Sequence, residues 1–599
     1  MIGRFLVLYT PDGEVRTVLD QGVADTLTLS VALDAGSIVV YTSDPALGIR
    51  LSSRGVILGA VFPRHGPPRR VTTLMENEVG EKSNSIEQTL IDRYWGNYVA
   101  ILPRHRSIRI IRAPMGSYPC YYMWRETMFV AASDPDILRE CGLLAPEVAW
   151  DAVARTLVYP DFPEQSTALT GLSELLPGHE LQVTTGMVTR RECWSPWDFV
   201  DPRTQAPSGS LSERVVREVS NACVSLASLS ERIVIGVSGG LDSSIIAASL
   251  ASKRQSVNCL TLFTADPHGD ERTYSRSICE HFNLPLREVP YRMEDVDLDV
   301  SVVRHRPRPG AKIHELAYQR AVRVLAAEVG AGAFMTGVGG DNVFYNSQSA
   351  RPIVDRAYTE GLSVGLIRTV RDVCALTECS VSQAIAEAFR VAFIRGRAYR
   401  WQTDHTYLSH NLRGSLALPL HAWLQPPNRV LPGTAAHVAL LLRVQHNLEG
   451  HDDIWNLPVL NPLAAQPLVE LCLGIPSWSM CEGGHNRSAV RKAFANILPA
   501  EIAFRRTKGG PDGFAIALLA ANWMSIRERL LDGAMAQQGL LDRGALEHIF
   551  ARGPTENPGD YTRLLRLLDT EAWSQRWARL GPGAASHTTR TVSRSHQGA

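Results

Sequence analysis

A glycine-rich turn between an apolar run and a small-residue run is the feature that most constrains the fold. Residues 233–237 (IVIGV) predict a buried parallel strand, and residues 245–250 (IIAASL) predict a helix. Between them lie residues 238–244 (SGGLDSS). Glycines let the backbone approach a ligand closely, and the N–H groups and dipole of a helix start favour an anion. The turn is therefore predicted to bind phosphate, and a carboxylate beside phosphates, Asp242, indicates a bridging Mg²⁺.

The pattern around this turn predicts a doubly wound parallel sheet. Helical patterns alternate with strand patterns, the helices over 211–230, 243–253, 271–283 and 314–329 and the strands over 233–237, 258–264, 286–290 and 333–336. In such sheets ligands bind beyond the carboxyl ends of the strands. After residue 345 the pattern is mostly helical. The first 200 residues instead carry short β-like runs punctuated by Gly and Pro, such as 37–41, 98–102 and 108–112.

Length and composition limit the possible domain organisation and the possible binding partners. A chain of 599 residues is too long for one core, so we expect domains over 1–200 and 211–583, a Pro/Gly/Ser-rich linker over 201–210 and a disordered tail over 584–599. The 61 basic and 61 acidic residues balance, which argues against nucleic-acid binding. No apolar run reaches the roughly 18 residues of a membrane helix. The first residues read as a strand rather than a signal peptide, and the ten scattered cysteines predict free thiols, so we expect a cytoplasmic protein.

Two further motifs carry groups that suit phosphate chemistry. Residues 336–342 (TGVGGDN) follow another apolar run, and Asp341 could complete a Mg²⁺ site with Asp242; the alternative is a sheet-edge turn with a capping Asp. Residues 505–510 (RRTKGG) contain Lys508, which could stabilise charge on a phosphate; the alternative is a solvated basic turn. The pair at 270–271 (DE) either caps a helix or forms an edge of the site.

With these motifs, residues 211 to about 580 resemble the synthetase domain of the asparagine synthetase B superfamily. The matching segments lie at 238–244, 270–271, 336–341, 461–477 (NPLAAQPLVELCLGIPS) and 506–510. The segments at 94–98, 112–119, 129–133 and 176–179 resemble the glutaminase-like domain of the same superfamily. The resemblance implies an N-terminal Ntn-type α+β β-sandwich and a C-terminal, ATP-pyrophosphatase-type doubly wound parallel sheet with added helices.

The resemblance also implies the site and its cofactors, ATP and Mg²⁺. Asp242 and Asp341 would hold the metal, and together with Lys508 they would form the catalytic centre. The implied nucleotide-binding residues are Val237, Ser238, Gly239, Gly240, Asp242, Ser243, Ser244, Leu262, Thr336, Gly337, Gly339 and Gly340.

One departure from the superfamily narrows the expected reaction. A working glutaminase uses an N-terminal cysteine exposed by removal of Met, but residue 2 here is Ile2 and no cysteine precedes Cys120. We therefore expect no ammonia from glutamine, as in β-lactam synthetases and lasso-peptide cyclases. β-Lactam synthetases use a tyrosine in the second glycine loop, where this chain has Val338, which cannot act as a base. Segments 341–344, 348–350 and 466–470 resemble the lasso-peptide cyclases.

The resemblance implies an AMP-forming macrolactam synthetase that joins an Asp or Glu side chain of a core peptide to the peptide's own N-terminal amine. Its expected partners are the precursor peptide, a leader peptidase and a leader-binding protein. A β-lactam-synthetase-like or other small-molecule amide ligase remains the first alternative, and a non-catalytic binding homologue the second. Tyr345, Trp401 and Trp455 are candidates for either the peptide cavity or the core.

Overall fold

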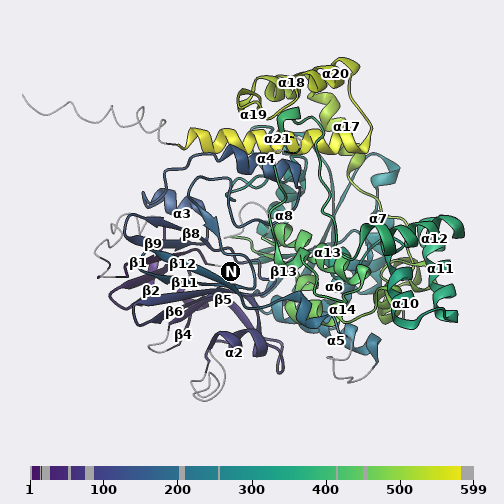
Figure 1. Cartoon of the computed structure of the whole chain (residues 1–599), viewed down its shortest axis with the longest axis horizontal. Coiled ribbons are helices and arrows are strands. Elements are labelled where there is room, and N and C mark those ends of the chain that lie inside the picture. Colours follow the sequence, from purple (N-terminus) through teal and green to yellow (C-terminus); the bar gives the residue numbers. More distant parts are fainter. Residues whose placement is uncertain are drawn as a thin grey trace, which may run out of the picture.

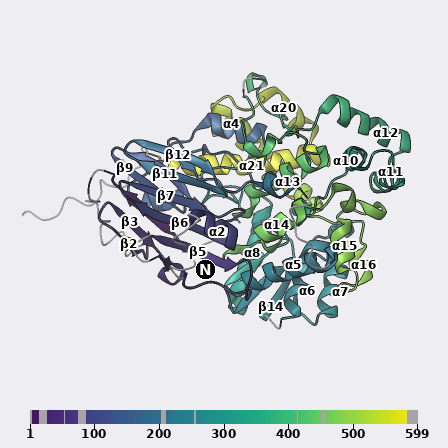
Figure 2. The same ribbon diagram turned by 60° about the horizontal axis from the view of Figure 1, so that its bottom comes forward.

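The N-terminal part of the chain folds into two stacked antiparallel sheets (Figures 1 and 2). The computed structural model describes residues 3–11, 13, 15, 27–51, 55–74, 86–201, 210–253, 256–412, 414, 416–449 and 456–581. One sheet has the order β10-β8-β9-β1-β3-β2, with β1 (Phe5–Tyr9), β2 (Ser30–Asp34), β3 (Ile38–Thr42), β8 (Tyr121–Arg125), β9 (Met128–Ala132) and β10 (Ser173–Glu174). The other has the order β12-β11-β7-β6-β5-β4, with β4 (Ile49–Arg50), β5 (Val56–Pro63), β6 (Tyr94–Arg104), β7 (Ser107–Arg112), β11 (His179–Thr184) and β12 (Met187–Glu192).

Strand alternation divides the apolar side chains of this sandwich between a core enclosed by the two sheets and one further cluster on each outer face. Phe5 and Val7 of β1 enter the core between the sheets, whereas Leu6 and Leu8 face the opposite side. The outer faces are covered by α2 (Ile86–Arg93) on one sheet and by α3 (Pro135–Glu140) and α4 (Trp150–Val158) on the other. Every residue of β1 is thus buried, which explains why its sequence reads as continuously apolar.

A five-stranded parallel sheet follows, in the order β15-β14-β13-β16-β17. Its strands are β13 (Arg232–Gly236), β14 (Ser256–Phe263), β15 (Leu286–Pro290), β16 (Ala333–Met335) and β17 (Val459–Leu460). Helices α5 (Leu211–Ala227), α6 (Leu241–Ala251) and α7 (Arg272–His281) lie on one face, and α8 (Glu315–Val329) covers the other. The predicted fold class, antiparallel sheets followed by a doubly wound parallel sheet with added helices, is confirmed.

The remaining described chain is mostly helical, as predicted. Its helices are α9 (Gly340–Val343), α10 (Arg351–Glu360), α11 (Val364–Thr377), α12 (Val381–Phe389), α13 (Pro432–Leu448), α14 (Gln466–Leu473), α15 (Ser488–Phe494), α16 (Ala500–Ala503), α17 (Asp512–Ala521), α18 (Trp523–Asp532), α19 (Ala534–Gln537), α20 (Arg543–Arg552) and α21 (Pro558–Arg579). Within the described ranges, no helix is both long enough and apolar enough to cross a membrane.

Helix α21 joins the two halves of the molecule (Figure 1). Arg576 contacts Asp136 of α3 at 3.0 Å, whereas Asp569 accepts a 2.7 Å hydrogen bond from the backbone N–H of Val302, in the half that contains the parallel sheet. The helix is therefore bonded to both sides of the seam between the sandwich and the parallel sheet.

Some sequence predictions concern residues outside the described ranges, and others concern aromatic residues within them. The linker, apart from its end residues 201 and 210, and the tail at 584–599 lie outside the described residues, as does Trp455. Tyr345 and Trp401 are buried, 3% and 6% exposed, and belong to the hydrophobic core. Of the two roles open to them, the structure supports the core.

Candidate active site

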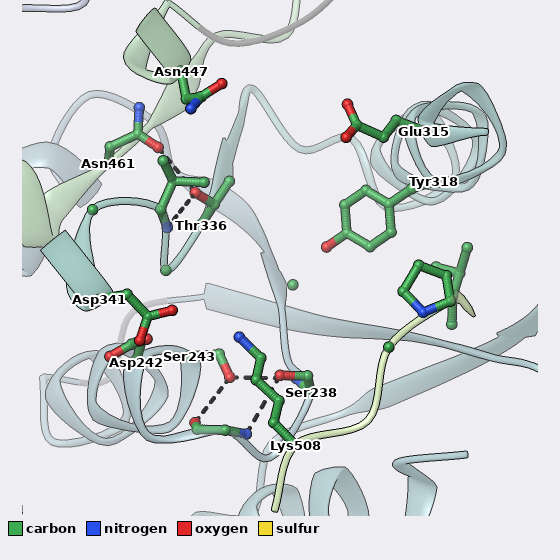
Figure 3. Close-up of a pocket in the computed structure, with 18 of the residues that line it drawn as sticks. Ser238, Asp242, Ser243, Glu315, Tyr318, Thr336, Asp341, Asn447, Asn461 and Lys508 are labelled. Atoms are coloured by element: carbon green, nitrogen blue, oxygen red, sulfur yellow. Dashed lines mark hydrogen bonds between the residues drawn. The ribbon is translucent and has the colours of Figure 1, made fainter. Parts of the chain in front are cut away.

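The strand order places two glycine-rich loops side by side at the carboxyl edge of the parallel sheet. From β13 the chain adds β14 and β15 on one side of the sheet, whereas β16 and β17 are added on the other side of β13. Ligands bind in the crevice at such a switch point, here between β13 and β16. The loop after β13 and the loop after β16 both line a cavity of about 770 Å³ at this point (Figure 3). The cavity is therefore the candidate active site.

The first loop is shaped for close approach of an anion to the backbone. Gly239 has φ +64°, and a Cβ there would lie 2.2 Å from the Cβ of Tyr274, so only glycine fits. Helix α6 starts after Gly240 without any side-chain cap. The Ser243 hydroxyl instead accepts from the backbone N–H of Ser238 and donates to the carbonyl of Gly240. The uncapped helix start keeps backbone donors available for phosphate oxygens.

Most of the predicted nucleotide-binding residues line the cavity, and three do not. Those that do are Val237, Ser238, Gly240, Asp242, Ser243, Leu262, Thr336, Gly337 and Gly339. Gly239 packs on Tyr274, and Gly340 packs on Asp242. Ser244 is fully buried inside α6 and its hydroxyl does not line the cavity, so the expected contact of phosphates with both Ser243 and Ser244 stays a prediction.

The two predicted metal ligands converge on one cationic atom. Nη1 of Arg487 lies 2.8 Å from Oδ2 of Asp242 and 2.7 Å from Oδ1 of Asp341. Burial raises the pKa of the Asp242 carboxyl, and the Arg487 guanidinium opposes that shift. Arg487 itself is buried and has φ +54°, an uncommon conformation for a residue with a side chain. The sequence analysis did not find Arg487, which no predicted motif contains.

This arrangement fits a divalent cation. Carboxylate oxygens from two separate loops surround a point at which a positive charge already stands, and Mg²⁺ prefers such ligands together with waters and phosphate oxygens. Gly340 permits the close approach, because a Cβ there would lie 2.4 Å from Cγ of Asp242. Across the described residues, no three His, Cys, Asp or Glu side chains converge as a complete metal cage. The pair therefore suits a cation that arrives with a nucleotide.

Lys508 enters the cavity from a loop that a buried ion pair holds in place. Glu271 accepts a 2.7 Å hydrogen bond from Nη2 of Arg505 and a 2.8 Å hydrogen bond from the backbone N–H of Gly509. The Arg505 guanidinium also stacks over the ring of Tyr274, 3.6 Å from its centroid. The Asp270–Glu271 pair was expected either to cap a helix or to form an edge of the site. Glu271 lies at the edge of the site, and its side chain forms no capping hydrogen bond with α7. Lys508 thereby points toward the centre of the cavity (Figure 3).

Helix α8 forms the wall opposite the phosphate loops (Figure 3). Lys312, just before the helix, lines this wall together with Glu315, Tyr318 and Gln319. Burial raises the pKa of the Glu315 carboxyl. The Gln319 amide is 7% exposed, and neither of its polar atoms has a partner among the described residues. This wall offers polar groups to a second ligand, and the sequence motifs gave no sign of it.

A family comparison now identifies the chain. The model of the asparagine synthase family matches residues 230–575, which contain the parallel sheet, both glycine loops, Arg487 and Lys508. The chain belongs to the asparagine synthase family. Members of this family are ATP-dependent amide ligases, and the matched residues include nearly all of those that line the cavity at the switch point.

Comparison with solved structures gives distant similarities only. One is an allosteric regulatory enzyme of purine biosynthesis, 10% identical, with a TM-score of 0.20, 48% of this chain and 74% of that chain being covered. Another is the glutamine phosphoribosylpyrophosphate amidotransferase from B. subtilis complexed with ADP and GMP, also 10% identical, with a TM-score of 0.19 and coverages of 48% and 59%. Neither similarity supports a conclusion at such TM-scores. No curated protein matches the chain.

Proposed function

We propose that this protein is a glutamine-independent, AMP-forming macrolactam synthetase that closes a ring in a core peptide, as the lasso-peptide cyclases do. One observation carries the proposal: a single cavity of about 770 Å³ has a phosphate-binding wall and, opposite it, a wall of polar groups for an acceptor. Both reacting groups of one substrate could therefore meet in the same cavity, the carboxylate at the α-phosphate and the amine at the resulting acyl carbon.

Cys120 of the sandwich is not suited to act as a nucleophile for glutamine hydrolysis. Cys120 is fully buried, and burial raises the pKa of its thiol to about 12, so it cannot form a thiolate near neutral pH. The first cysteine of the chain is thus unsuited to the role that the superfamily gives to an N-terminal cysteine. This supports an amine that arrives with the substrate.

The seam between the sandwich and the synthetase half supports the same conclusion. Arg112 is 1% exposed and pairs with Glu174 at 2.6 Å and with Glu449 of the synthetase half at 2.9 Å. Arg308 pairs with Glu174 from the other side. Two cavities found along this seam in the described structure measure about 20 Å³ each, room for about one water molecule. Ionic side chains line one of these two cavities, so at this point the seam is closed by paired charges rather than open to a passage for ammonia.

In the proposed reaction, an Asp or Glu carboxylate of the peptide attacks the α-phosphate of ATP, which gives an acyl-adenylate and pyrophosphate. The peptide's N-terminal amine then attacks the acyl carbon, and AMP leaves. Asp242 and Asp341 would hold Mg²⁺, which when bound neutralises charge on the phosphates. Lys508 stabilises charge on the α-phosphate and then on the tetrahedral intermediate.

The amine needs only modest help to react. Its pKa lies near 7.7–8.0, so part of it is neutral at working pH. We assign the proton that it releases to the carboxylate of Glu315, on the acceptor wall, because its raised pKa suits it to accept one. Holding both ends of one peptide in this cavity turns ring closure into a positioned intramolecular step.

Mass spectrometry on the purified chain tests the proposal. The reaction contains MgATP, the precursor peptide encoded beside the gene and the partner protease, without glutamine. We expect a core peptide lighter by one water, with AMP and pyrophosphate formed. Asp242→Asn should abolish the product, whereas Asp532→Asn, on an exposed side chain, should not. AMP formed from a small carboxylate but not from the peptide would favour the small-molecule ligase, and no nucleotide turnover with any carboxylate would favour the binding homologue.

A further inference from the structure

Exposed apolar side chains are concentrated in one helical segment whose residues do not line the active-site cavity. We call residues 351–395, which comprise α10, α11, α12 and the π-helical turn Arg390–Arg395, the helical finger. Of the eighteen large hydrophobic side chains that are exposed in the described chain, nine lie between residues 358 and 394 of this finger. The most exposed are Leu362 at 99%, Phe393 at 76% and Ile394 at 73%. Such a concentration marks an interaction surface, since single exposed apolar residues are scattered on ordinary surfaces.

The exposed side chains form a stripe along α12 and a cluster at its end. Val381, Ile385, Phe389 and Phe393 follow one another four residues apart, and the rings of Phe389 and Phe393 stack with centroids 5.6 Å apart. The Tyr358 hydroxyl donates to the carbonyl of Ala392, which ties the end of α10 to the π turn. The stripe runs over thirteen residues, or about 18 Å of helix from its first residue to its last.

The finger does not need these side chains for its own core. Its interior is filled by other residues of the same helices, among them Val354, Val373, Ala388 and Val391, all buried. The exposed stripe therefore lies on the outer side of a helix whose inner side is already packed. The finger lies at the edge of the molecule away from the sandwich (Figures 1 and 2), so the stripe faces outward.

Charge indicates the kind of partner. From Phe389 to Trp401 the chain has four arginines and no carboxylate. A second copy of the chain would bring the same arginines against one another. Glu387, within the helix that carries the stripe, already pairs with Arg390 and Arg395, which shows that these arginines can bind a protein carboxylate beside the stripe. An apolar stripe flanked by arginine suits a protein helix with acidic residues beside its own apolar face.

We propose that the helical finger docks an amphipathic helix of a partner protein, with Asp or Glu residues beside its apolar face. The inference rests on the proposed function, which requires that another protein release the core peptide and hand it over. Docking on the finger would hold that protein beside the synthetase without occupying the cavity. The stripe would contact about three turns of the partner helix.

Binding to defined probes tests the surface itself. Two synthetic 14-residue amphipathic helices share one leucine face and differ only in Glu or Lys flanks, and both are titrated by fluorescence anisotropy. We expect the Glu peptide to bind at least tenfold more tightly than the Lys peptide, and Phe389→Asp with Phe393→Asp to weaken it at least tenfold. The matched control is Met187→Asp with Met524→Asp, which changes two exposed apolar residues elsewhere. Equal binding of both peptides, or of neither, would overturn the proposal.

Two further measurements separate the other occupants of the stripe. Co-sedimentation with vesicles of phosphatidylcholine and phosphatidylglycerol, lost in the Phe389/Phe393 variant, would assign the stripe to a membrane instead. Self-association in sedimentation velocity, lost in the same variant, would assign it to a second copy. We expect neither.

An activity comparison keeps this proposal distinct from the proposed function. With free core peptide, the Phe389/Phe393 variant should turn over MgATP and close the ring at the normal rate. With precursor delivered through the partner protease, its rate should fall at least tenfold, whereas the Met187/Met524 control should not change. Equal loss in both assays would contradict a docking role, and absence of ring closure in the unmodified protein would instead refute the proposed function.

Discussion

Arg487→Met should tighten the binding of a divalent cation in the absence of nucleotide. In the structure the guanidinium stands where the carboxylates of Asp242 and Asp341 converge, so a cation must displace it. Asp242 is nearly buried, with 11% of its side chain exposed, whereas 46% of the Asp341 side chain is exposed. The hydrogen bond to Asp242 therefore accounts for most of the free energy needed to displace the guanidinium. One charged hydrogen bond contributes about 1.5–3 kcal/mol. Its removal should therefore lower the Kd for Mn²⁺ about ten- to hundredfold.

The assay is a Mn²⁺ titration by electron paramagnetic resonance, with thermal unfolding as a second readout. In EDTA the Arg487→Met protein should be less stable than the parent by about 3–5 kcal/mol at most, because Asp242 is left without its counter-charge. Saturating Mn²⁺ should remove most of that difference. Arg491→Met is the matched control, since Arg491 lines the same cavity but bonds the Ala503 carbonyl and Asn486 rather than the carboxylates. Unchanged or weaker Mn²⁺ binding in Arg487→Met would refute the idea that the guanidinium competes with the metal.

Three further changes test other parts of the structure. Gly340→Ala places a Cβ 2.4 Å from Cγ of Asp242 and should reduce ATP–pyrophosphate exchange at least tenfold. The control is Gly544→Ala, where the new Cβ has no neighbour closer than 3.6 Å and exchange should not change. Equal effects of the two substitutions would show that the contact between Gly340 and Asp242 is unimportant. Lys508→Ala should lower kcat, measured by pyrophosphate release, about 10²–10³-fold. The Kd for ATP, measured by calorimetry, should change little. A change mainly in that Kd would show instead that Lys508 binds ATP in the ground state. Burial raises the pKa of Asp569 to about 7, above its unfolded value, so its stabilising contribution is complete below about pH 4 and is lost as pH rises through about 7. Asp569→Asn should flatten the decline in melting temperature from pH 5 to pH 8, and an unchanged slope would contradict this.

The sequence predicts the parts of the fold that local patterns determine. The strand expected at 286–290 is β15 with the same bounds, and the other strands of the parallel sheet lie within one or two residues of their expected positions, apart from β17, for which no strand was predicted. Apolar runs bounded by glycine turns are local signals, and the position of the phosphate loop follows from them. The phosphate wall of the site could therefore be predicted from the sequence.

The rest of the site depends on contacts between distant residues. Arg487 lies 245 residues from Asp242 in the chain, and only the packed fold brings them together. The α8 wall was seen only as a helix, because a helical pattern does not say which face meets a cavity. Ser244 was placed at the site because it belongs to the motif at 238–244, but a motif does not say which side chains of the helix start face the cavity, and the Ser244 side chain is buried.

The contacts of α21 bear on how this protein is made. The helix follows every other described element in the chain, and it bonds α3 on one side and the backbone at Val302 on the other. On the ribosome, the sandwich and the parallel sheet can each begin to fold as they emerge, but their joint remains incomplete until residues 558–579 have left the exit tunnel. Translation that stops before Pro558 would release a single chain whose two partly folded halves are not joined by α21. Such a product would be degraded by proteases rather than act as a shorter enzyme.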